Sequence, residues 1–367
     1  MNILVINWQD RLNPLSGGAE VHLHEIFGRI VRKGHSVTLL CSSFPGAKKR
    51  EVVDGMRVIR MGSRNTFNFF APGGVKMLLR QEKYDVLVDD INKIPFYTPI
   101  YVRLPIVAIL HHFFDRTIYR QTGLVPASYV YLSERIVPLL YRKVPFAVVS
   151  ESTKEDIISK GIPEVNIRVI HNGIDHRTYA PDYSLKSRSP LVCYLGRLKK
   201  YKSVDILIKA MVVVRRQVPD VRLLIIGDGD HRPTLMRMAD ELGLKDCIEF
   251  TGYIAIEEKV RFLQTAQLVV NPSPREGWGL TSVEANACGT PVVASDVPGL
   301  RDSCRDGETG FLFPFGDTNS LVNRIVTILR DEPLRQTLSR NAVTWARKFD
   351  WNNSANEMES LLHSVVR

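Results

Sequence analysis

The sequence contains few cysteines, and none is spaced to form a metal-binding pair. The five cysteines are scattered along the chain, as Cys41, Cys193, Cys247, Cys288 and Cys304, with no C-x-x-C pattern. Disulfide-rich secreted domains and structural zinc modules require closely spaced cysteines, so neither class fits. The pattern favours a reducing compartment, and we expect a cytoplasmic protein.

The sequence also lacks a long uninterrupted apolar segment. A membrane-spanning helix needs about 20 apolar residues, and even a run of about 18 without a charge does not occur. The first residues, MNILVINW, show no basic region ahead of a long apolar run and no small-residue cleavage site. We therefore expect neither a membrane span nor a secretion signal.

The charge is unevenly distributed. The net charge is +10, of which residues 1–182 carry +7 and the remainder +3. This excess fits an anionic partner, such as a phosphorylated acceptor or the inner face of the plasma membrane, and equally fits an ordinary solvated surface. We find no recognition helix, zinc finger or aromatic-basic sheet motif, so nucleic acid is not an expected partner.

Strand-like and helix-like segments alternate along the chain, which predicts an α/β fold. Two domains are expected from the length of 367 residues. The alternation stops in a turn-rich stretch near residues 180–188 and then restarts, which indicates two Rossmann-like, doubly wound parallel sheets that face each other. The predicted strands are NILVIN, SVTLLC, YDVLVD, PIVAIL, FAVVS and IRVIH in the first half, then LVCYL, VRLLIIG, IEFTG, LVVNP and PVVAS.

The expected domains are residues 1–182, residues 183–348 and a C-terminal helix at 349–367. This last segment has a broad apolar face made of Trp351, Met358, Leu361, Leu362 and Val365. It follows the point at which the second sheet is complete. We predict that it crosses back onto the first domain.

Two glycine-containing or basic loops after predicted strands suit an anion. In PLSGGAE, Gly17 and Gly18 precede a helix, whose free N–H groups attract phosphate, although a tight turn explains the glycines equally well. In YLGRLKKYKS, Arg197 and Lys202 are candidates for a diphosphate. The alternative for the second loop is an exposed basic surface.

A third stretch, EGWGLTSVE, places two glutamates around the start of a helix. If the helix begins near Leu280, its first N–H groups are available to a phosphate. Glu284 then lies about one turn into the helix and suits the hydroxyls of a ribose, whereas Glu276 precedes the glycines and suits a hexose. The Asp228-Gly229-Asp230 run is interpreted as a β-to-α turn with a helix cap, and not as a metal site.

Taken together, these motifs resemble the family 4 retaining glycosyltransferases of the GT-B architecture. The resemblance runs nearly end to end, through SGGAE, VVSEST, HNGID, GRLKKYKS, IGDGD and the E-x7-E pair. It implies transfer of a hexose from a UDP- or GDP-linked sugar to a saccharide or lipid-linked acceptor. It assigns Arg197 and Lys202 to the donor diphosphate, Glu284 to the ribose, Glu276 to the transferred sugar, the backbone of Gly279, Leu280 and Thr281 to sugar and phosphates, and Gly18 to the diphosphate across the cleft.

His111 is the expected active-site histidine. It ends the PIVAIL strand where the family has such a residue, while His112 occupies a position at which the family usually has Asp, so either imidazole could do the work. No metal cage is visible, and we expect neither cofactor nor catalytic metal. The resemblance implies front-face attack by an acceptor hydroxyl, with the departing phosphate taking its proton.

Two other functions remain open on the sequence. One is a non-catalytic nucleotide-sugar-binding subunit of a polysaccharide assembly complex, and the other is a GT-B sugar phosphate enzyme or phosphorylase. The sequence says least about the acceptor, whose binding site is expected mainly in the first domain. Residues 64–80 combine three phenylalanines with three basic residues, which fits either a membrane-facing surface or a buried aromatic cluster.

Overall fold

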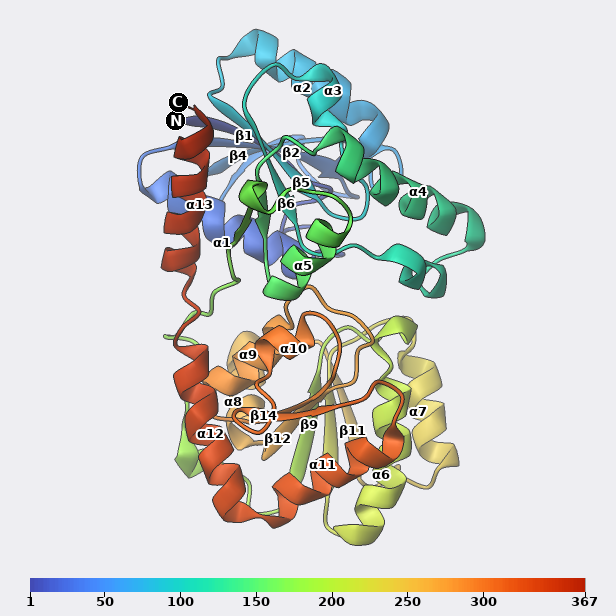
Figure 1. Ribbon diagram of the computed structural model, residues 1–367. Coiled ribbons are helices and arrows are strands. Elements are labelled where there is room, and N and C mark those ends of the chain that lie inside the picture. Colours follow the sequence, from blue (N-terminus) through green and yellow to red (C-terminus); the bar gives the residue numbers. More distant parts are fainter. Residues whose placement is uncertain (367) are drawn as a thin grey trace. The chain divides into compact units, whose positions relative to one another are not determined.

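The computed structural model of the protein describes residues 1–366 and divides into two compact units (Figure 1). Unit 1 comprises Met1–Gly173 together with the C-terminal segment that begins at Trp351, and unit 2 comprises Ile174–Asp350. Each unit is built on its own, largely parallel sheet flanked by helices. The prediction of two doubly wound α/β domains is confirmed.

Unit 1 is organised around an eight-stranded sheet with the order β3-β4-β2-β1-β5-β6-β7-β8. The strands are β1 (Asn2–Ile6), β2 (Ser36–Ser43), β3 (Arg50–Val53), β4 (Met56–Ser63), β5 (Val86–Ile91), β6 (Ile106–Leu110), β7 (Phe146–Val148) and β8 (Ile167–Val169). All neighbours are parallel except β3 and β4. The order reverses between β1 and β5, and ligands of such sheets bind at the carboxyl ends of the strands at this switch point.

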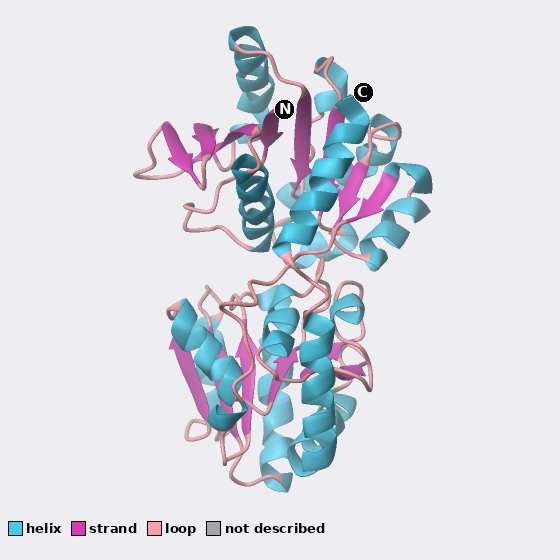
Figure 2. Ribbon diagram, turned by 90° about the vertical axis from the view of Figure 1, so that its left-hand side faces the viewer, coloured by secondary structure: helices cyan, strands magenta, loops and turns pink. Residues whose placement is uncertain are grey.

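The side chains of β1 explain why helices cover both faces of this sheet. Successive strand residues point to opposite faces. Ile3 and Val5 belong to a core shared with helices α1 and α13, whereas Leu4 and Ile6 belong to a second core shared with helix α2. All four side chains are fully buried, so neither face can be left to solvent. Figure 2 shows the resulting helices on either side of the strands.

The helices of unit 1 follow the strands in sequence. They are α1 (Gly18–Arg32), α2 (Phe67–Gln81), α3 (Thr98–Tyr101), α4 (Leu124–Leu140), α5 (Glu151–Ser159) and α13 (Trp351–Val366), with short 3-10 turns η1 (Asp115–Arg120) and η2 (Glu164–Asn166). Most of the 64–80 region therefore forms α2. Phe67 is buried in its core, whereas Phe69 and Phe70 are exposed.

Unit 2 contains a six-stranded parallel sheet with the order β11-β10-β9-β12-β13-β14. Its strands are β9 (Leu191–Leu195), β10 (Arg222–Ile226), β11 (Ile248–Gly252), β12 (Leu268–Asn271), β13 (Val292–Ser295) and β14 (Gly310–Phe313). Its helices are α6 (Val204–Gln217), α7 (Arg232–Glu241), α8 (Ile256–Thr265), α9 (Leu280–Ala287), α10 (Leu300–Ser303), α11 (Thr318–Arg330) and α12 (Glu332–Ala346), with 3-10 turns η3 (Tyr183–Leu185) and η4 (Lys200–Lys202). The switch point lies between β9 and β12.

Three strands are missing from the sequence-based assignment. β3 and β4 form an antiparallel hairpin whose turn residues, Asp54 and Gly55, both have positive φ, at 52° and 82°. An Asp-Gly pair between β-rich runs is a strong hairpin signal, so this hairpin was predictable. β14 is only four residues long, GFLF, and carries no alternation that distinguishes it from a short loop.

The C-terminal helix α13 packs on unit 1, as predicted. It lies beside α1 (Figure 1). Trp351, Met358, Leu361 and Leu362 are buried in the core formed by α1 and one face of the sheet, and Val365 packs against that core. The apolar face read from the sequence is therefore the packing face.

The units divide at slightly different points from those expected, which were after residues 182 and 348. The segment that follows Gly173 is bound within unit 2: the N–H of Ile174 donates to the carbonyl of Phe349 at 3.1 Å, and the Tyr179 hydroxyl donates to Glu284. Such long-range contacts leave no periodic pattern in the sequence. No described helix combines the length and apolar composition that a bilayer-spanning segment requires.

A buried ion pair fastens the loop after β1 to β4. Arg60 donates from Nε and Nη2 to the two carboxylate oxygens of Asp10, at 2.7 and 3.0 Å, and neither side chain is accessible to solvent. Burial by itself raises the pKa of Asp10, but the hydrogen bonds from Arg60 and from the Leu12 N–H outweigh it, so the pKa is lowered. Arg60 also donates from Nη1 to Glu51 at 2.9 Å.

We predict that Arg60→Met lowers the free energy of unfolding by about 3–5 kcal/mol at pH 7, because it leaves the buried Asp10 carboxylate without a positively charged partner. Wild-type Asp10 has a lowered pKa, so its contribution to stability is present above pH of about 4 and is lost as the pH falls through the folded-state pKa. The difference between wild type and variant, measured by urea unfolding, should therefore shrink as the pH falls below about 4. A double variant that adds Asp10→Asn should recover part of the loss, and an unchanged stability of Arg60→Met would contradict the assignment.

Candidate active site

The strongest site in unit 2 lies at the switch point of its sheet. The loop after β9 carries Arg197 and Lys202, and the loop after the adjacent strand β12 carries Glu276. The Lys202 ammonium binds the Glu276 carboxylate, and their side chains are only 16 % and 18 % exposed. The structure thus brings together a predicted phosphate-binding cation and the first glutamate of the E-x7-E pair.

Two glycines fix the loop that holds Glu276. Gly299, directly before α10, has φ 79°, and a Cβ there would lie 2.2 Å from the carbonyl oxygen of Glu276. Gly279, the N-cap of α9, has φ 76°, and a Cβ would lie 2.6 Å from Ser303 Oγ. L-residues rarely adopt such dihedrals, so both positions require glycine. The loop is therefore held against α10 by close backbone contacts.

The start of α9 offers the expected N–H groups. Leu280 and Thr281 are its first two residues, so their N–H groups have no acceptor within the helix. The N–H of Ser282 already donates to the carbonyl of Gly279 at 2.9 Å. The N–H groups of Leu280 and Thr281 thus lie unpaired within α9, at the helix end whose dipole favours an anion.

Glu284 lies farther along α9 in a network that the sequence did not reveal. Its Oε1 accepts hydrogen bonds from the Tyr179 hydroxyl at 2.8 Å and from Lys259 Nζ at 3.0 Å, while its Oε2 is buried and accepts no hydrogen bond from the described residues. Burial raises the pKa of Tyr179, and the Glu284 charge raises it further, so the phenol stays protonated as a donor. Glu284 Oε1 is thus fully hydrogen-bonded, whereas Oε2 can still accept a hydrogen bond.

Arg197 differs from its basic neighbours. Its side chain is exposed, and its guanidinium makes no hydrogen bond or ion pair with any described residue. By contrast, Lys199 pairs with Asp230 at 2.9 Å. The buried Tyr194 hydroxyl donates to the carbonyl of Arg197 at 3.2 Å. Burial raises the pKa of Tyr194, the Glu276 charge raises it further and Arg197 lowers it, so both charges act on this hydroxyl.

The Asp228-Gly229-Asp230 run forms the expected β-to-α turn but does not cap α7. The N-cap of α7 is His231, with no side-chain cap. Asp228 instead accepts from the N–H of Gly229 at 2.7 Å, and Asp230 holds Lys199. The expected cap was wrong because these two carboxylates find nearer partners.

In unit 1 the predicted glycines lie at the start of α1. Gly17 is the N-cap, and its N–H donates to Glu20 Oε2 at 2.6 Å, which is one half of a capping box, since glycine has no side chain to supply the other half. A Cβ at Gly18 would meet nothing within 4 Å, and its φ is not in the left-handed region. The fold therefore does not require glycine at position 18.

His111 follows β6 and is oriented by a buried carboxylate. Its Nε2 lies 3.2 Å from Asp90 Oδ1 in β5, and the His22 ring of α1 packs edge-on at a centroid distance of 5.0 Å. Burial lowers the pKa of His22 well below its usual value, and the neighbouring His111 lowers it further. The His112 ring lies 4.5 Å from that of Phe114. The sequence analysis missed Asp90 and His22, because nothing in their local pattern links them to His111.

The structure places the predicted residues in separate groups. Lys202 and Glu276 are in direct contact, the backbone of Gly279, Leu280 and Thr281 begins α9, and Glu284 has its own partners in the same unit. Gly17, Gly18 and His111 belong to unit 1. Among residues 1–366, no hydrogen bond or ion pair joins the Lys202–Glu276 pair to the Glu284 network.

Two family descriptions match the chain. Residues 16–178 match "Glycosyltransferase Family 4", and residues 175–345 match "Glycosyl transferases group 1". The D-inositol 3-phosphate glycosyltransferase of Mycolicibacterium smegmatis is 36 % identical over 214 residues, which cover 55 % of this chain and 47 % of that protein. The chain spans about half the length of the curated relatives it matches.

Solved structures share the fold over nearly the whole chain. Sucrose-phosphate synthase from Thermosynechococcus elongatus has a TM-score of 0.83 at 22 % identity, covering 99 % of this chain and 98 % of that one. Anabaena HepE in complex with UDP-glucose has a TM-score of 0.77 at 24 % identity, covering 99 % of this chain and all of that one. At these identities the similarity establishes the architecture of the two sheets.

We predict that two glycine-to-alanine substitutions differ in their effect on stability. Gly299→Ala should lower the free energy of unfolding by at least about 2 kcal/mol, because alanine combines an unfavourable φ with a backbone clash. Gly18→Ala should leave stability unchanged or raise it by up to about 1 kcal/mol, since its site has space and α1 starts there. Thermal and urea unfolding of both variants measure this, and equal effects would contradict the described loop geometry.

Proposed function

Because the chain belongs to the family 4 glycosyltransferases of the GT-B architecture, we propose that it transfers a hexose, with retention, from a nucleotide diphosphate sugar to a saccharide or lipid-linked acceptor. The observation that carries this proposal is the Lys202–Glu276 pair at the switch point of unit 2, beside the N-terminus of α9. A cation and unpaired N–H groups suit a diphosphate, and a carboxylate suits sugar hydroxyls. The cellular role that we infer is polysaccharide or glycolipid synthesis.

Unit 2 would supply the donor contacts. Arg197, which has no partner to give up, would bind the diphosphate in a fork, and Lys202 would move from Glu276 to a phosphate oxygen. Glu276 would then accept hydrogen bonds from the hexose. The available Oε2 of Glu284 would accept from a ribose hydroxyl while Tyr179 and Lys259 hold the other oxygen.

Unit 1 would contribute His111, Gly17 and Gly18. The space around Gly18 supports a close approach of a phosphate to the backbone, since packing does not explain the glycine. Asp90 holds the His111 ring in one orientation, which supports a role at the edge of the transferred sugar. We favour His111 over His112 on this ground.

The proposed chemistry needs no metal. As the bond between the anomeric carbon and the leaving phosphate breaks, negative charge grows on the diphosphate, and Arg197, Lys202 and the N-terminus of α9 would stabilise it. The sugar develops oxocarbenium character. The acceptor hydroxyl would attack from the same face, and its proton would pass to the departing phosphate.

The donor is best sought among UDP-sugars first. One of the similar structures holds UDP-glucose, and GDP-sugars remain the second set. Thermal stabilisation by a panel of UDP-, GDP- and ADP-sugars would identify the base, since a ligand that binds only the folded state raises the unfolding midpoint. Binding without transfer or hydrolysis would instead support the non-catalytic subunit.

We further propose that α4 rests on an anionic membrane surface. Val125, Tyr129, Leu132, Ile136 and Leu139 recur at helical spacing and are all exposed, Leu139 at 79 %. We call this set the α4 stripe. Arg135, Arg142 and Lys143 flank it and are also exposed. An exposed apolar stripe with basic flanks is suited to the interface of a bilayer that contains anionic lipid, and it would place the protein at the inner face of the plasma membrane.

The α4 stripe extends toward α2, where the exposed Phe69 and Phe70 lie. Asn68 Nδ2 donates to the Tyr129 hydroxyl at 2.7 Å, which connects the two helices. The membrane-facing surface that was one of the two interpretations of residues 64–80 would therefore consist of α4 together with the start of α2.

We predict that Lys202→Ala reduces kcat/KM for transfer by about 10²–10³-fold, since a charge that stabilises the leaving group is removed. Lys200→Ala is the matched control, because Lys200 is an exposed cation of the same loop. Circular dichroism and thermal unfolding should show both variants folded. Full activity in Lys202→Ala would refute the assignment of this residue.

We predict that Leu139→Glu weakens binding to vesicles of phosphatidylcholine and phosphatidylglycerol by about tenfold, because it removes apolar burial and adds repulsion. Val165→Glu, at an exposed position of η2, is the control for the added charge. Cosedimentation measures both. Equal binding of the two variants, or binding that does not depend on phosphatidylglycerol, would rule out this surface.

A further inference from the structure

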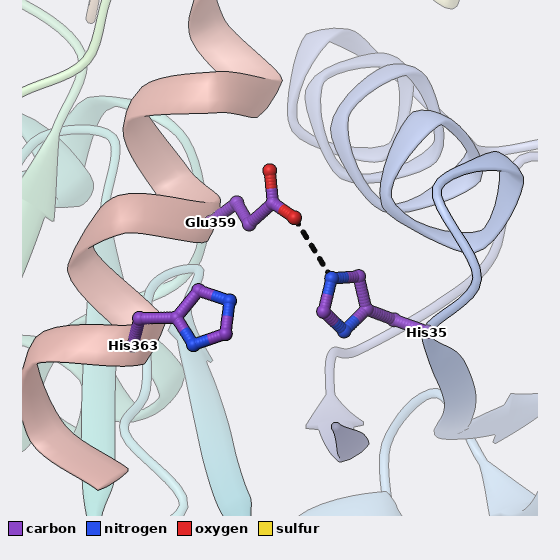
Figure 3. A group of neighbouring side chains, drawn as sticks. All are labelled: His35, Glu359 and His363. Carbon is purple, nitrogen blue, oxygen red and sulfur yellow. Dashed lines mark hydrogen bonds and ion pairs between the residues drawn. The ribbon is translucent and has the colours of Figure 1, made fainter. Parts of the chain in front are cut away.

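A second group of polar side chains lies in unit 1, between α13 and the residues that join α1 to β2. His35 precedes β2, while Glu359 and His363 lie one turn apart on α13 (Figure 3). Their candidate ligand atoms all lie within 4.8 Å of one another, and residues 1–366 contain no other such group of three histidines, cysteines or acidic residues. The sequence analysis did not identify it, since His35 is separated by 324 positions from Glu359.

Two of the three side chains are already held in place. His35 Nε2 and Glu359 Oε1 are 2.8 Å apart, and the Met1 nitrogen lies 2.9 Å from His35 Nδ1. Lys33 Nζ occupies the other oxygen of Glu359, at 2.5 Å. This hydrogen bond lowers the pKa of Glu359, so the carboxylate is ionised at neutral pH.

His363 is the least constrained member of the group. Its ring is exposed, lies 5.7 Å from the His35 ring between centroids, and makes no hydrogen bond or ion pair with the described residues. Figure 3 shows its ring directed toward the space beside His35 and Glu359. Solvent therefore has direct access to the group from the side of His363.

We propose that His35, Glu359 and His363 form a site for a borderline transition-metal ion such as Zn²⁺. The ligands would be His35 Nε2, Glu359 Oε1 and one ring nitrogen of His363, with water completing the shell. Two imidazoles and one carboxylate suit Zn²⁺ and its first-row neighbours, whereas Mg²⁺ and Ca²⁺ prefer oxygen ligands alone.

Binding of a metal ion by these three side chains requires only a small rearrangement. Ligand atoms around a tetrahedral Zn²⁺ are about 3.3 Å apart, so atoms that lie within 4.8 Å of one another need to close by at most about 1.5 Å, which rotation of the exposed His363 side chain can supply. The metal would replace the hydrogen bond between His35 and Glu359, and the proton held between these atoms would be released to solvent.

The proposed ion would tie α13 to the end of α1. All three ligands belong to unit 1, and none is among the residues assigned above to donor binding or chemistry. The site would therefore stabilise the docking of the C-terminal helix and would not take part in transfer. It does not depend on the proposed function.

The test is titration of the full chain with ZnCl₂ after dialysis against a chelator. We expect one Zn²⁺ per chain by isothermal titration calorimetry and a rise of several degrees in the thermal midpoint at saturating metal. His363→Ala and Glu359→Gln should each weaken binding at least tenfold. MgCl₂ at the same concentration should produce no shift.

Glu357→Gln is the matched control, because it removes the same charge from an exposed position of the same helix. It should bind Zn²⁺ like the wild type. Without metal, His363→Ala should unfold at the wild-type temperature, which shows that the side chain has no structural role of its own. Wild-type affinity in His363→Ala, or a shift with MgCl₂ equal to that with ZnCl₂, would overturn the proposal.

Discussion

The structure depends on the burial of both faces of each sheet. Ile3 and Val5 face one helical layer while Leu4 and Ile6 face the other, so the connections between parallel strands must carry helices to both sides. A doubly wound sheet reverses its strand order once, and the loops at that point diverge instead of covering one another. The divergence of the loops after the adjacent strands β9 and β12 is thus a consequence of side-chain alternation, and Lys202 and Glu276 meet there for that reason.

Much of the fold could be predicted, because its signals are local and repeated. Apolar strands, helical periodicity and the apolar face of α13 all lie within short windows, and each led to an element that the structure contains. The Asp54–Gly55 pair indicates the hairpin of β3 and β4, although the strand assignment from the sequence does not include it. The four-residue β14 and the attachment of residues 174–182 to unit 2 depend on contacts with distant parts of the chain, for which no local signal exists.

The candidate site was predictable in part for the same reason. Residues that follow a strand or begin a helix can be placed from the sequence, which holds for Arg197, Glu276 and Leu280. The side chains that contact these site residues cannot be placed in this way. Tyr179 meets Glu284 across 105 positions, and Lys259 meets it across 25. These contacts arise only when α8, α9 and the segment after unit 1 have packed, so single-sequence reasoning assigns a role to Glu284 without the groups that orient it.

The pairing of charges in unit 2 gives Glu276 a structural role in the loop before α9. Opposite charges about 4 Å apart attract by about 4 kcal/mol at an effective dielectric constant of 20, and Lys202 and Glu276 are mostly buried and in direct contact. Either residue alone would therefore be unfavourable in this position. The proposed nucleotide-sugar donor would supply a new partner to each residue: phosphate oxygens to the Lys202 ammonium and hydroxyl donors to the Glu276 carboxylate. Under the proposed function, Arg197 would add to binding, because its guanidinium gives up no partner among the described residues. The same two residues would therefore stabilise the loop before binding and hold the donor afterwards.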